Sequence, residues 1–361
     1  MASEMSDQAG SPGRGVVIAA ILISVSAMMI LVELFSSELL MFRYRHSGVL
    51  DDGAISSFVL VKKAAAKLGW GSEPNLLDME CIPSPCLKKD PTFGWSAVSG
   101  AFTVILKRRK RDDSDWETLP VKVTMNSDES RWTGMPAQSE KPTIYILGDS
   151  FALGSGVNDE QTFAYHLQMA NPQYNVKLFA VGGYGLVHSY LRIEQLKSQV
   201  TERDIVIICY ADFYDVRNVA APSRLRDIEN WYKKRNLPND GSKIPVASIG
   251  NDERLSINLV SQDCQERRSY CDSKDPPLSE TRAISLRLIH EIAGATPAKA
   301  YLLHFDGAKD NPVVQDCGIE VISALQDDFG YFLRDDIVGF DPHPGPYWHY
   351  AISRKLISRI H

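Results

Sequence analysis

The sequence predicts an α/β fold built on a mostly parallel sheet. From Pro142 onward, short apolar runs with the length of strands alternate with longer stretches that have helical spacing. This alternation is typical of a parallel sheet with helices on both faces. The 361 residues suffice for one such domain with additions. We expect the domain to span residues 141–361.

Each element follows from its local pattern. Five apolar runs are predicted as strands: Thr143–Leu147, Val176–Ala180, Asp204–Tyr210, Ala300–Phe305 and Ile319–Ile322. Four stretches with helical spacing are predicted as helices: Glu160–Ala170, Leu186–Val200, Ser279–Ala293 and Tyr347–Ile360. Residues 221–277 are polar with little periodicity, and we interpret them as an insertion over the ligand-binding edge of the sheet.

A long apolar segment lies near the N-terminus. The run Val16–Val32 carries no charge, and the apolar character continues to residue 42. About 20 residues cross a bilayer as a helix, and a cleavable signal peptide has a shorter core. We therefore predict a transmembrane signal anchor at residues 16–42; a cleaved peptide and a buried core helix are the alternatives. Arginines on both sides leave the orientation undecided.

The segments around this anchor are a tail at residues 1–15 and a linker with a small β-rich region at residues 43–140. Two β-rich runs in that region flank the basic cluster Lys107–Arg111, which we interpret as a solvated turn. The net charge of −6 provides no basic field for a polyanion. Nucleic acid is therefore not an expected partner.

The cysteines indicate the compartment. Cys81 and Cys86 form one close pair and Cys264 and Cys271 another, each in a polar stretch, and neither spacing fits a zinc site. Such pairs are typical of loops closed by disulfides in an oxidising environment, although spacing alone leaves the pairing open. Cys209, inside a predicted strand, is interpreted as a buried thiol. We expect a single-pass membrane protein whose main domain is extracytoplasmic, either periplasmic or extracellular.

The stretch "ILGDSFALGSG" places Ser150 on the turn after the first predicted strand. A serine there can direct its hydroxyl into a cleft while its amide stabilises an oxyanion. A phosphate-binding loop is disfavoured because its lysine is missing. The nucleophile elbow G-x-S-x-G is missed because Ala152 stands at the position of the second glycine. The alternatives are a nucleophile and an ordinary strand-to-helix turn.

A serine nucleophile needs a base and a carboxylate that orients it. His343 and Asp341 lie two residues apart in the Pro-rich loop "GFDPHPGPYWH", ahead of the last predicted helix. His304, at a strand end, is interpreted as a core histidine with satisfied hydrogen bonds. His188, near a helix start, is as consistent with a capping or surface residue as with a ligand.

Two further turns bring polar groups to the same edge of the sheet. The Gly-rich turn Ala180–Gly185 lets backbone amides approach a ligand closely. After the third strand, "YADFYDVRNV" supplies side-chain donors and acceptors from Asp212, Tyr214, Asp215 and Asn218. Three turns and one loop therefore converge on one cleft.

Together these residues resemble the SGNH (GDSL-type) hydrolase superfamily. "GDSFALGSGVNDEQTFAYHL" is similar to its first block, with Ser150 as nucleophile, and "AVGGYG" to its second, with Gly183 as an oxyanion donor. "DPHP" is similar to its last block, with Asp341 and His343 as carboxylate and base. The resemblance implies a flavodoxin-like three-layer α/β/α sandwich and ester chemistry with no cofactor or metal.

The third block departs from the family pattern. The expected Gly-x-Asn-Asp is missing: Tyr214 and Asp215 stand near its place, and Asn218 is the only asparagine. Either Asn218 or Tyr214 donates to the oxyanion, or one donor has been lost. Loss of such a donor typically costs about 10²–10³ in rate.

The resulting prediction is a membrane-anchored serine esterase. His343, held by Asp341, deprotonates Ser150, which forms an acyl-enzyme with an ester or acylated carbohydrate, while the Ser150 and Gly183 amides bind the oxyanion. One alternative is an O-acetyltransferase that modifies a cell-surface polysaccharide and works with polysaccharide-biosynthesis proteins. Another is a catalytically silent binding or scaffold protein on the same fold.

Overall fold

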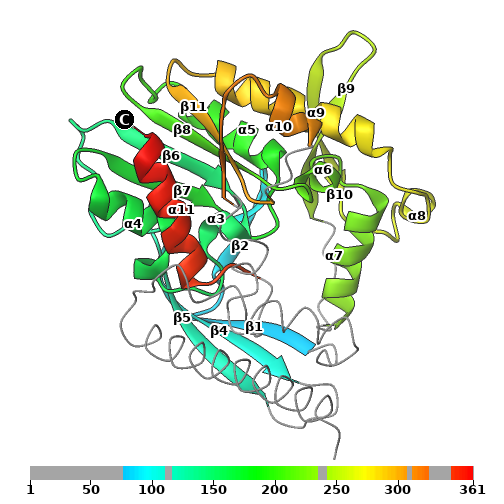
Figure 1. Ribbon diagram of the computed structural model, residues 1–361. Coiled ribbons are helices and arrows are strands. Elements are labelled where there is room, and N and C mark those ends of the chain that lie inside the picture. Colours follow the sequence, from blue (N-terminus) through cyan, green and yellow to red (C-terminus); the bar gives the residue numbers. More distant parts are fainter. Residues whose placement is uncertain (1–75, 110–115, 235–241, 307–310, 325–342, 361) are drawn as a thin grey trace, which may run out of the picture. The chain divides into compact units, whose positions relative to one another are not determined.

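Figure 1 presents a computed structural model of the chain, coloured along the sequence. The structure describes residues 76–109, 116–234, 242–306, 311–324 and 343–360. No helix within these ranges is long and apolar enough to cross a bilayer. The predicted tail at residues 1–15 and the predicted anchor at residues 16–42 lie outside the described residues.

A five-stranded parallel sheet is the centre of the fold, with the order β12-β11-β8-β6-β7. The strands are β6 (Thr143–Gly148), β7 (Asn175–Ala180), β8 (Ile205–Tyr210), β11 (Lys299–His304) and β12 (Glu320–Ser323). Counted in chain order this is 2-1-3-4-5, the flavodoxin-like order. Every residue of β6 and β8 is buried, which explains their uninterrupted apolar sequences. The predicted α/β class is confirmed.

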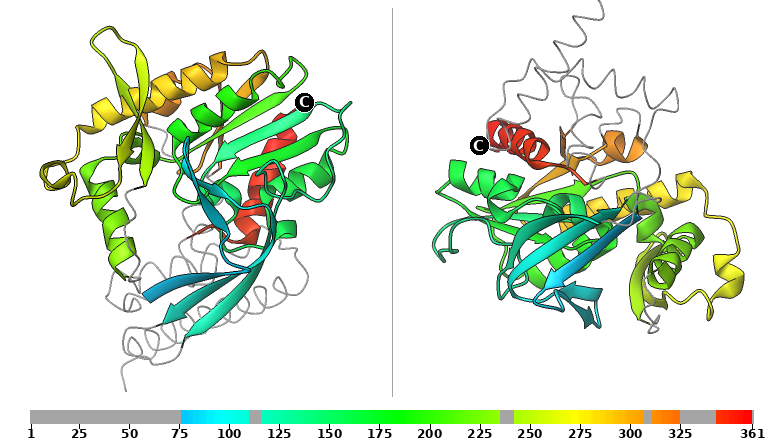
Figure 2. Two further views of the ribbon diagram at one scale, coloured as in Figure 1. Left: turned by 180° about the vertical axis from the view of Figure 1, so that it is seen from behind. Right: turned by 90° about the horizontal axis from the view of Figure 1, so that it is seen from below.

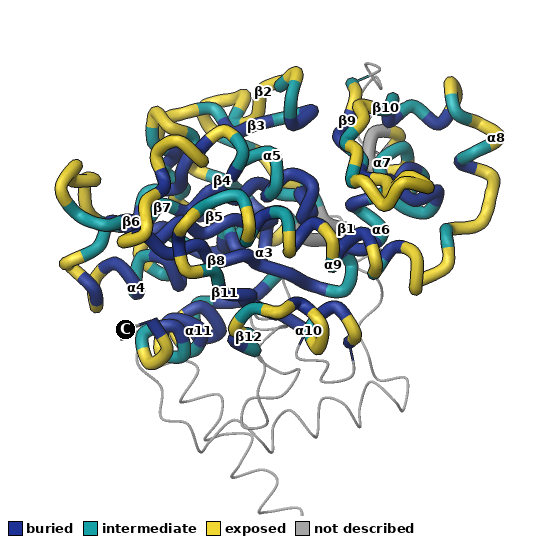
Figure 3. Tube along the Cα trace, turned by 90° about the horizontal axis from the view of Figure 1, so that it is seen from above, coloured by how far each residue is buried: buried dark blue, intermediate teal, exposed yellow. Residues whose placement is uncertain are grey.

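Helices cover both faces of this sheet. The long ones are α4 (Phe163–Ala170), α5 (Leu186–Leu196), α9 (Leu278–Gly294) and α11 (Pro346–Arg359). Helix α4 packs with α11 and α5 packs with α9, and the two pairs lie on opposite faces (Figure 2). Short helices follow three of the strands: α3 (Ser150–Leu153), α6 (Tyr214–Asn218) and α10 (Pro312–Asp316). The strands between these layers are the most deeply buried part of the described chain (Figure 3).

All five predicted strands occur, and each end agrees with the structure to within one residue. The predicted helix Glu160–Ala170 is interrupted. A 3-10 turn, η1 (Asp159–Gln161), comes first, and Thr162 then caps α4 by accepting a hydrogen bond from the Tyr165 amide at 3.1 Å. A capping threonine has extended backbone angles, so the helix starts after it.

The predicted β-rich region contains two antiparallel units. Strands β1 (Leu76–Ile82), β4 (Gly100–Arg109) and β5 (Glu117–Met125) form one, and β2 (Leu87–Asp90) and β3 (Gly94–Ala97) form the other. Phe93, Phe102 and Met125 of this region share a buried cluster with Val181 and Tyr184, which follow β7. The region therefore packs directly on the glycine-rich turn.

The insertion at residues 221–277 has more regular structure than its sequence indicates. It contains α7 (Pro222–Lys234), the hairpin of β9 (Lys243–Ile249) and β10 (Leu255–Ser261), and α8 (Arg268–Cys271). Leu225 and Ile244 form a small core with the half-cystines of the insertion. Because few apolar residues suffice for this satellite core, its sequence has little hydrophobic periodicity.

The close cysteine pairs are bonded within themselves, as Cys81–Cys86 and Cys264–Cys271. Cys209 is a buried free thiol, as predicted.

Candidate active site

Ser150 lies at the carboxyl end of β6, as the first residue of α3. Asp149 caps this helix, because its carboxylate accepts a hydrogen bond from the Phe151 amide at 2.9 Å. Gly148 is required for the sharp turn, since a Cβ there would lie 2.4 Å from the Ala152 Cβ. Ser150 is 7% exposed, so the residue is largely buried at this turn.

The glycine-rich turn lies against Ser150. A Cβ placed on Gly182 would lie 3.9 Å from the Ser150 Cβ. Gly183 has φ of +87°, a conformation that favours glycine. Among the described residues, the amides of Ser150 and Gly183 donate no hydrogen bond to another protein group. Two predicted oxyanion donors therefore lie in adjacent turns with their N–H groups available.

Arg217 connects the serine turn to the glycine-rich turn. Its guanidinium donates to the Asp149 carboxylate at 2.8 Å and to the Tyr184 carbonyl at 2.9 Å. It also lies 4.3 Å from the centre of the Phe213 ring. The Asp149 carboxylate, which is completely buried, is thus engaged by the helix cap and by this ion pair. These two interactions agree with a structural role for Asp149 rather than with membership of a catalytic triad.

The two candidates for the third oxyanion donor differ in their surroundings. The Asn218 side chain accepts from the Val187 amide at 3.2 Å and donates to the Ser285 hydroxyl at 3.0 Å. It therefore ties the start of α5 to α9. Tyr214 is fully buried, and its hydroxyl lies close enough to the buried Asp149 carboxylate to interact with it. Burial, followed by the nearby Asp149 carboxylate, raises the Tyr214 pKa well above its ordinary value, so the hydroxyl keeps its proton.

His343 lies in the segment that leads into α11 and is half-buried. Its ring is 5.5 Å from the Phe151 ring in a T-shaped arrangement. Phe151 directly follows Ser150, so the structure brings the predicted base to the neighbourhood of the predicted nucleophile. Asp341, the predicted carboxylate of the triad, lies outside the described residues.

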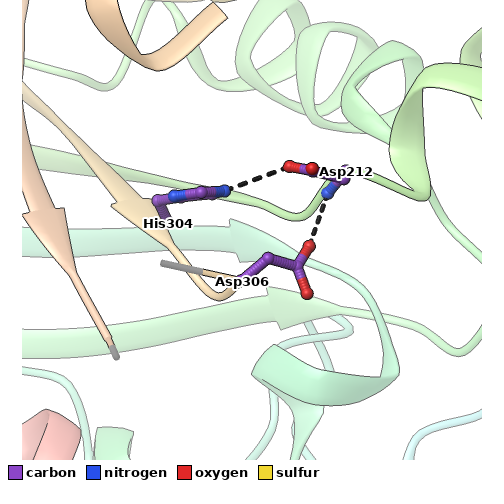
Figure 4. Close-up of side chains that lie close together, drawn as sticks. All are labelled: Asp212, His304 and Asp306. Carbon is purple, nitrogen blue, oxygen red and sulfur yellow. Dashed lines mark hydrogen bonds and ion pairs between the residues drawn. The ribbon is translucent and has the colours of Figure 1, made fainter. Parts of the chain in front are cut away.

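A second polar group lies at the same edge of the sheet and involves His304, at the end of β11. His304 is 1% exposed, and its Nε2 lies 3.2 Å from the Asp212 carboxylate (Figure 4). The hydrogen bond with His304 is the largest of the effects that lower the pKa of Asp212. Asp306 accepts a hydrogen bond from the Asp212 amide at 2.6 Å. His304 is thus a core histidine with a hydrogen-bond partner, as predicted.

The donor atoms of Asp212, His304 and Asp306 lie within 4.8 Å of one another, a spacing that a cation could use. However, Asp212 also accepts from the Asn311 amide at 2.7 Å, and the Arg282 guanidinium is 3.8 Å from its second oxygen. Since these neighbours already supply donors and a positive charge, we interpret the group as a hydrogen-bond network. Sequence reasoning placed Asp212 at this edge but missed its pairing with His304, although both follow adjacent parallel strands.

No family model matches the sequence. A search of curated proteins likewise finds no match.

Among solved structures, three similar ones come from bacteria. One is a member of the lipolytic protein G-D-S-L family from Veillonella parvula (12% identity, TM-score 0.30, covering 60% of this chain and 97% of that one). The second is the psychrotrophic esterase EstA from Pseudoalteromonas sp., at 13% identity and a TM-score of 0.33. The match covers 61% of this chain and 97% of that one. The third is an extracellular lipase from Streptomyces rimosus, at 12% identity and a TM-score of 0.33. The match covers 60% of this chain and 99% of that one.

Because the identities and TM-scores are low, we base the proposed function on the residues of this chain.

Proposed function

We propose that this protein is a serine ester hydrolase of SGNH type that acts on O-acyl esters through an acyl-enzyme. One juxtaposition carries the proposal: Ser150 lies beside Gly182, the Ser150 and Gly183 amides are available, and His343 packs on the next residue, Phe151. A nucleophile, amide donors and a base are the parts that acyl transfer requires.

The chemistry follows from these parts. His343 takes the proton from the Ser150 hydroxyl as its oxygen attacks the acyl carbon. The carbonyl oxygen becomes an oxyanion, which the amides of Ser150 and Gly183 bind. His343 then protonates the departing alcohol, leaving an acyl-enzyme that water hydrolyses by the same steps. Asp341 is the proposed carboxylate that orients His343.

For the third donor we favour Tyr214 over Asn218. Both polar ends of the Asn218 amide already make hydrogen bonds that link α5 and α9. The Tyr214 hydroxyl interacts with the carboxylate of Asp149, the residue before Ser150, and is not tied to α5 or α9. It keeps its proton and can therefore donate.

Replacing Ser150 tests the proposal directly. Ser150→Ala is expected to lower the rate of hydrolysis of 4-nitrophenyl acetate by more than about 10³-fold, since no other group can form the acyl-enzyme. Labelling by a fluorophosphonate probe should disappear as well. Ser155→Ala, five residues further along, is the matched control and should retain both. Normal turnover by a correctly folded Ser150→Ala variant would exclude the assignment, and absence of labelling in the unaltered protein would favour a silent binding protein.

We further propose an extracytoplasmic location with an N-terminal membrane anchor. The two disulfides support an oxidising compartment, because cytoplasmic proteins rarely retain them. The apolar sequence of residues 16–42 supports the anchor. Fractionation of cells that express the full chain, followed by protease treatment of intact spheroplasts, distinguishes an exposed domain from a cytoplasmic one.

A further inference from the structure

Trp95 and Arg224 meet over the glycine-rich turn, although one belongs to β3 and the other to α7 of the insertion. A Cβ placed on Gly183 would lie 3.1 Å from the Trp95 ring and 3.1 Å from an Arg224 guanidinium nitrogen. The preceding residue, Gly182, lies beside Ser150. An aromatic ring and a cation therefore flank the turn that carries a proposed oxyanion donor.

The Trp95 side chain is fixed in this position. Its indole N–H donates to the Gly182 carbonyl at 3.0 Å, and its own carbonyl accepts from the Tyr184 hydroxyl at 2.5 Å. The residue is half-buried. A fixed aromatic ring can contact a ligand at a low cost in conformational entropy.

Arg224 makes no close ion pair in the part of the chain that the structure describes. The Asp227 and Asp149 carboxylates attract it only from a longer distance, and its hydrogen bond is to the Gly183 carbonyl at 3.5 Å. The nearby Arg217, by contrast, is paired with Asp149 at 2.8 Å. Burial, followed by repulsion from Arg217, lowers the pKa of Arg224 to about 10. A half-buried guanidinium that makes no close ion pair, next to a second guanidinium, is a favourable place for an anion.

We propose that Trp95 and Arg224 form a substrate subsite that binds an O-acylated acidic sugar, with the sugar carboxylate on Arg224 and the sugar ring against Trp95. This inference rests on the proposed ester hydrolysis at Ser150 and names its substrate class. A guanidinium matches a carboxylate in charge and geometry. The Trp95 ring packs against Tyr184 and His188, and its exposed part offers apolar surface for the C–H groups of a sugar ring. The ester on the same sugar then reaches the turn beside Ser150.

Two methyl glycosides test the subsite, one of glucuronic acid and one of glucose, each acetylated at the same hydroxyl. They differ only in that glucose has a hydroxymethyl group in place of the carboxylate. We expect the unaltered protein to hydrolyse the glucuronide with a kcat/KM roughly 10- to 100-fold higher, as a charged hydrogen bond allows. In Arg224→Gln this ratio should fall to near one, mainly through KM. Arg224→Lys should recover part of it, because the charge remains while the two-pronged geometry is lost.

Arg226→Gln is the matched control, two residues along α7, where the guanidinium donates to the Cys271 carbonyl. It should keep the full ratio. Because each variant is measured on both sugars, partial misfolding cancels in the ratio. A ratio near one in the unaltered protein, or a ratio that Arg224→Gln leaves unchanged, overturns the subsite while hydrolysis of 4-nitrophenyl acetate upholds the proposed function. Absence of hydrolysis of all three esters overturns both.

Discussion

At the scale of single residues, Asp149 connects the local turn to the rest of the site. Its carboxylate accepts from the Phe151 amide and pairs with Arg217, which also reaches the Tyr184 carbonyl. One buried carboxylate thus positions both the serine turn and the glycine-rich turn. The pairing joins residues that are 68 positions apart, so the local sequence could not reveal it.

The two functions of Asp149 can be separated by substitution. Asp149→Asn keeps an oxygen for the helix cap but loses the charge opposite Arg217, and it should destabilise the fold by about 1–3 kcal/mol. Asp149→Ala loses the cap as well and should cost about 1 kcal/mol more. Urea unfolding of both variants measures the difference. Equal destabilisation in the two variants would show that the cap contributes nothing.

At the scale of elements, Arg131 fixes the loop that follows α3. It is completely buried, pairs with Asp159 at 3.0 Å, and its guanidinium donates to four backbone carbonyls, those of Lys122, Leu153, Gly154 and Val157. Two of these carbonyls lie within four residues of Ser150. The β-rich region is thereby bonded to the loop that shapes the proposed active site.

Arg131→Met is expected to destabilise the protein by about 3–5 kcal/mol, because it leaves the buried Asp159 carboxylate without its cation. Lys177→Met is the comparison: that lysine pairs with Asp128 at 2.8 Å, but both side chains are partly exposed. Loss of such a pair should cost less than about 1 kcal/mol. Urea unfolding under identical conditions compares the two, and similar losses would contradict the part assigned to Arg131.

At the scale of the whole molecule, two buried histidines link stability to pH. Burial is the main cause that lowers the pKa of His188 from 6.5 to about 3, and the Arg217 charge adds to it. Burial also lowers the pKa of His349 well below 6.5. Both imidazoles are therefore neutral in the folded protein at pH values where the unfolded chain protonates them.

Stability should consequently fall as the pH drops below about 6.5, because the unfolded state then binds more protons than the folded state. Each histidine contributes roughly 1.4 kcal/mol per pH unit, down to its folded pKa. Unfolding free energies from urea titrations at several pH values between 7.5 and 4.5 measure this slope. His188→Gln should reduce the slope by about 1.4 kcal/mol per pH unit, whereas an unchanged slope would contradict the effect of His188.

Much of the sheet and part of the candidate site could be predicted from the sequence. Strands β6 and β8 are buried along their whole length, so their sequences are continuous apolar runs that local composition reveals. The turn at Ser150 follows because a strand, a glycine and a capping aspartate are consecutive. The satellite core around Leu225 and Ile244 was not predicted, because so few apolar contacts leave no periodic pattern.

By itself, the sequence determined the α/β class, the strand positions, the turn that presents Ser150 and the closeness of each cysteine pair, all of which depend on neighbouring residues. Only the tertiary structure decided which distant groups meet. Asp212 and His304 are 92 residues apart, and Gly183 and Arg224 are 41 apart. The engagement of Asn218 by Val187 and Ser285 is likewise a matter of packing. Hydrogen bonds and ion pairs depend on distance in space, and the order of strands in the sheet sets that distance for residues far apart in sequence.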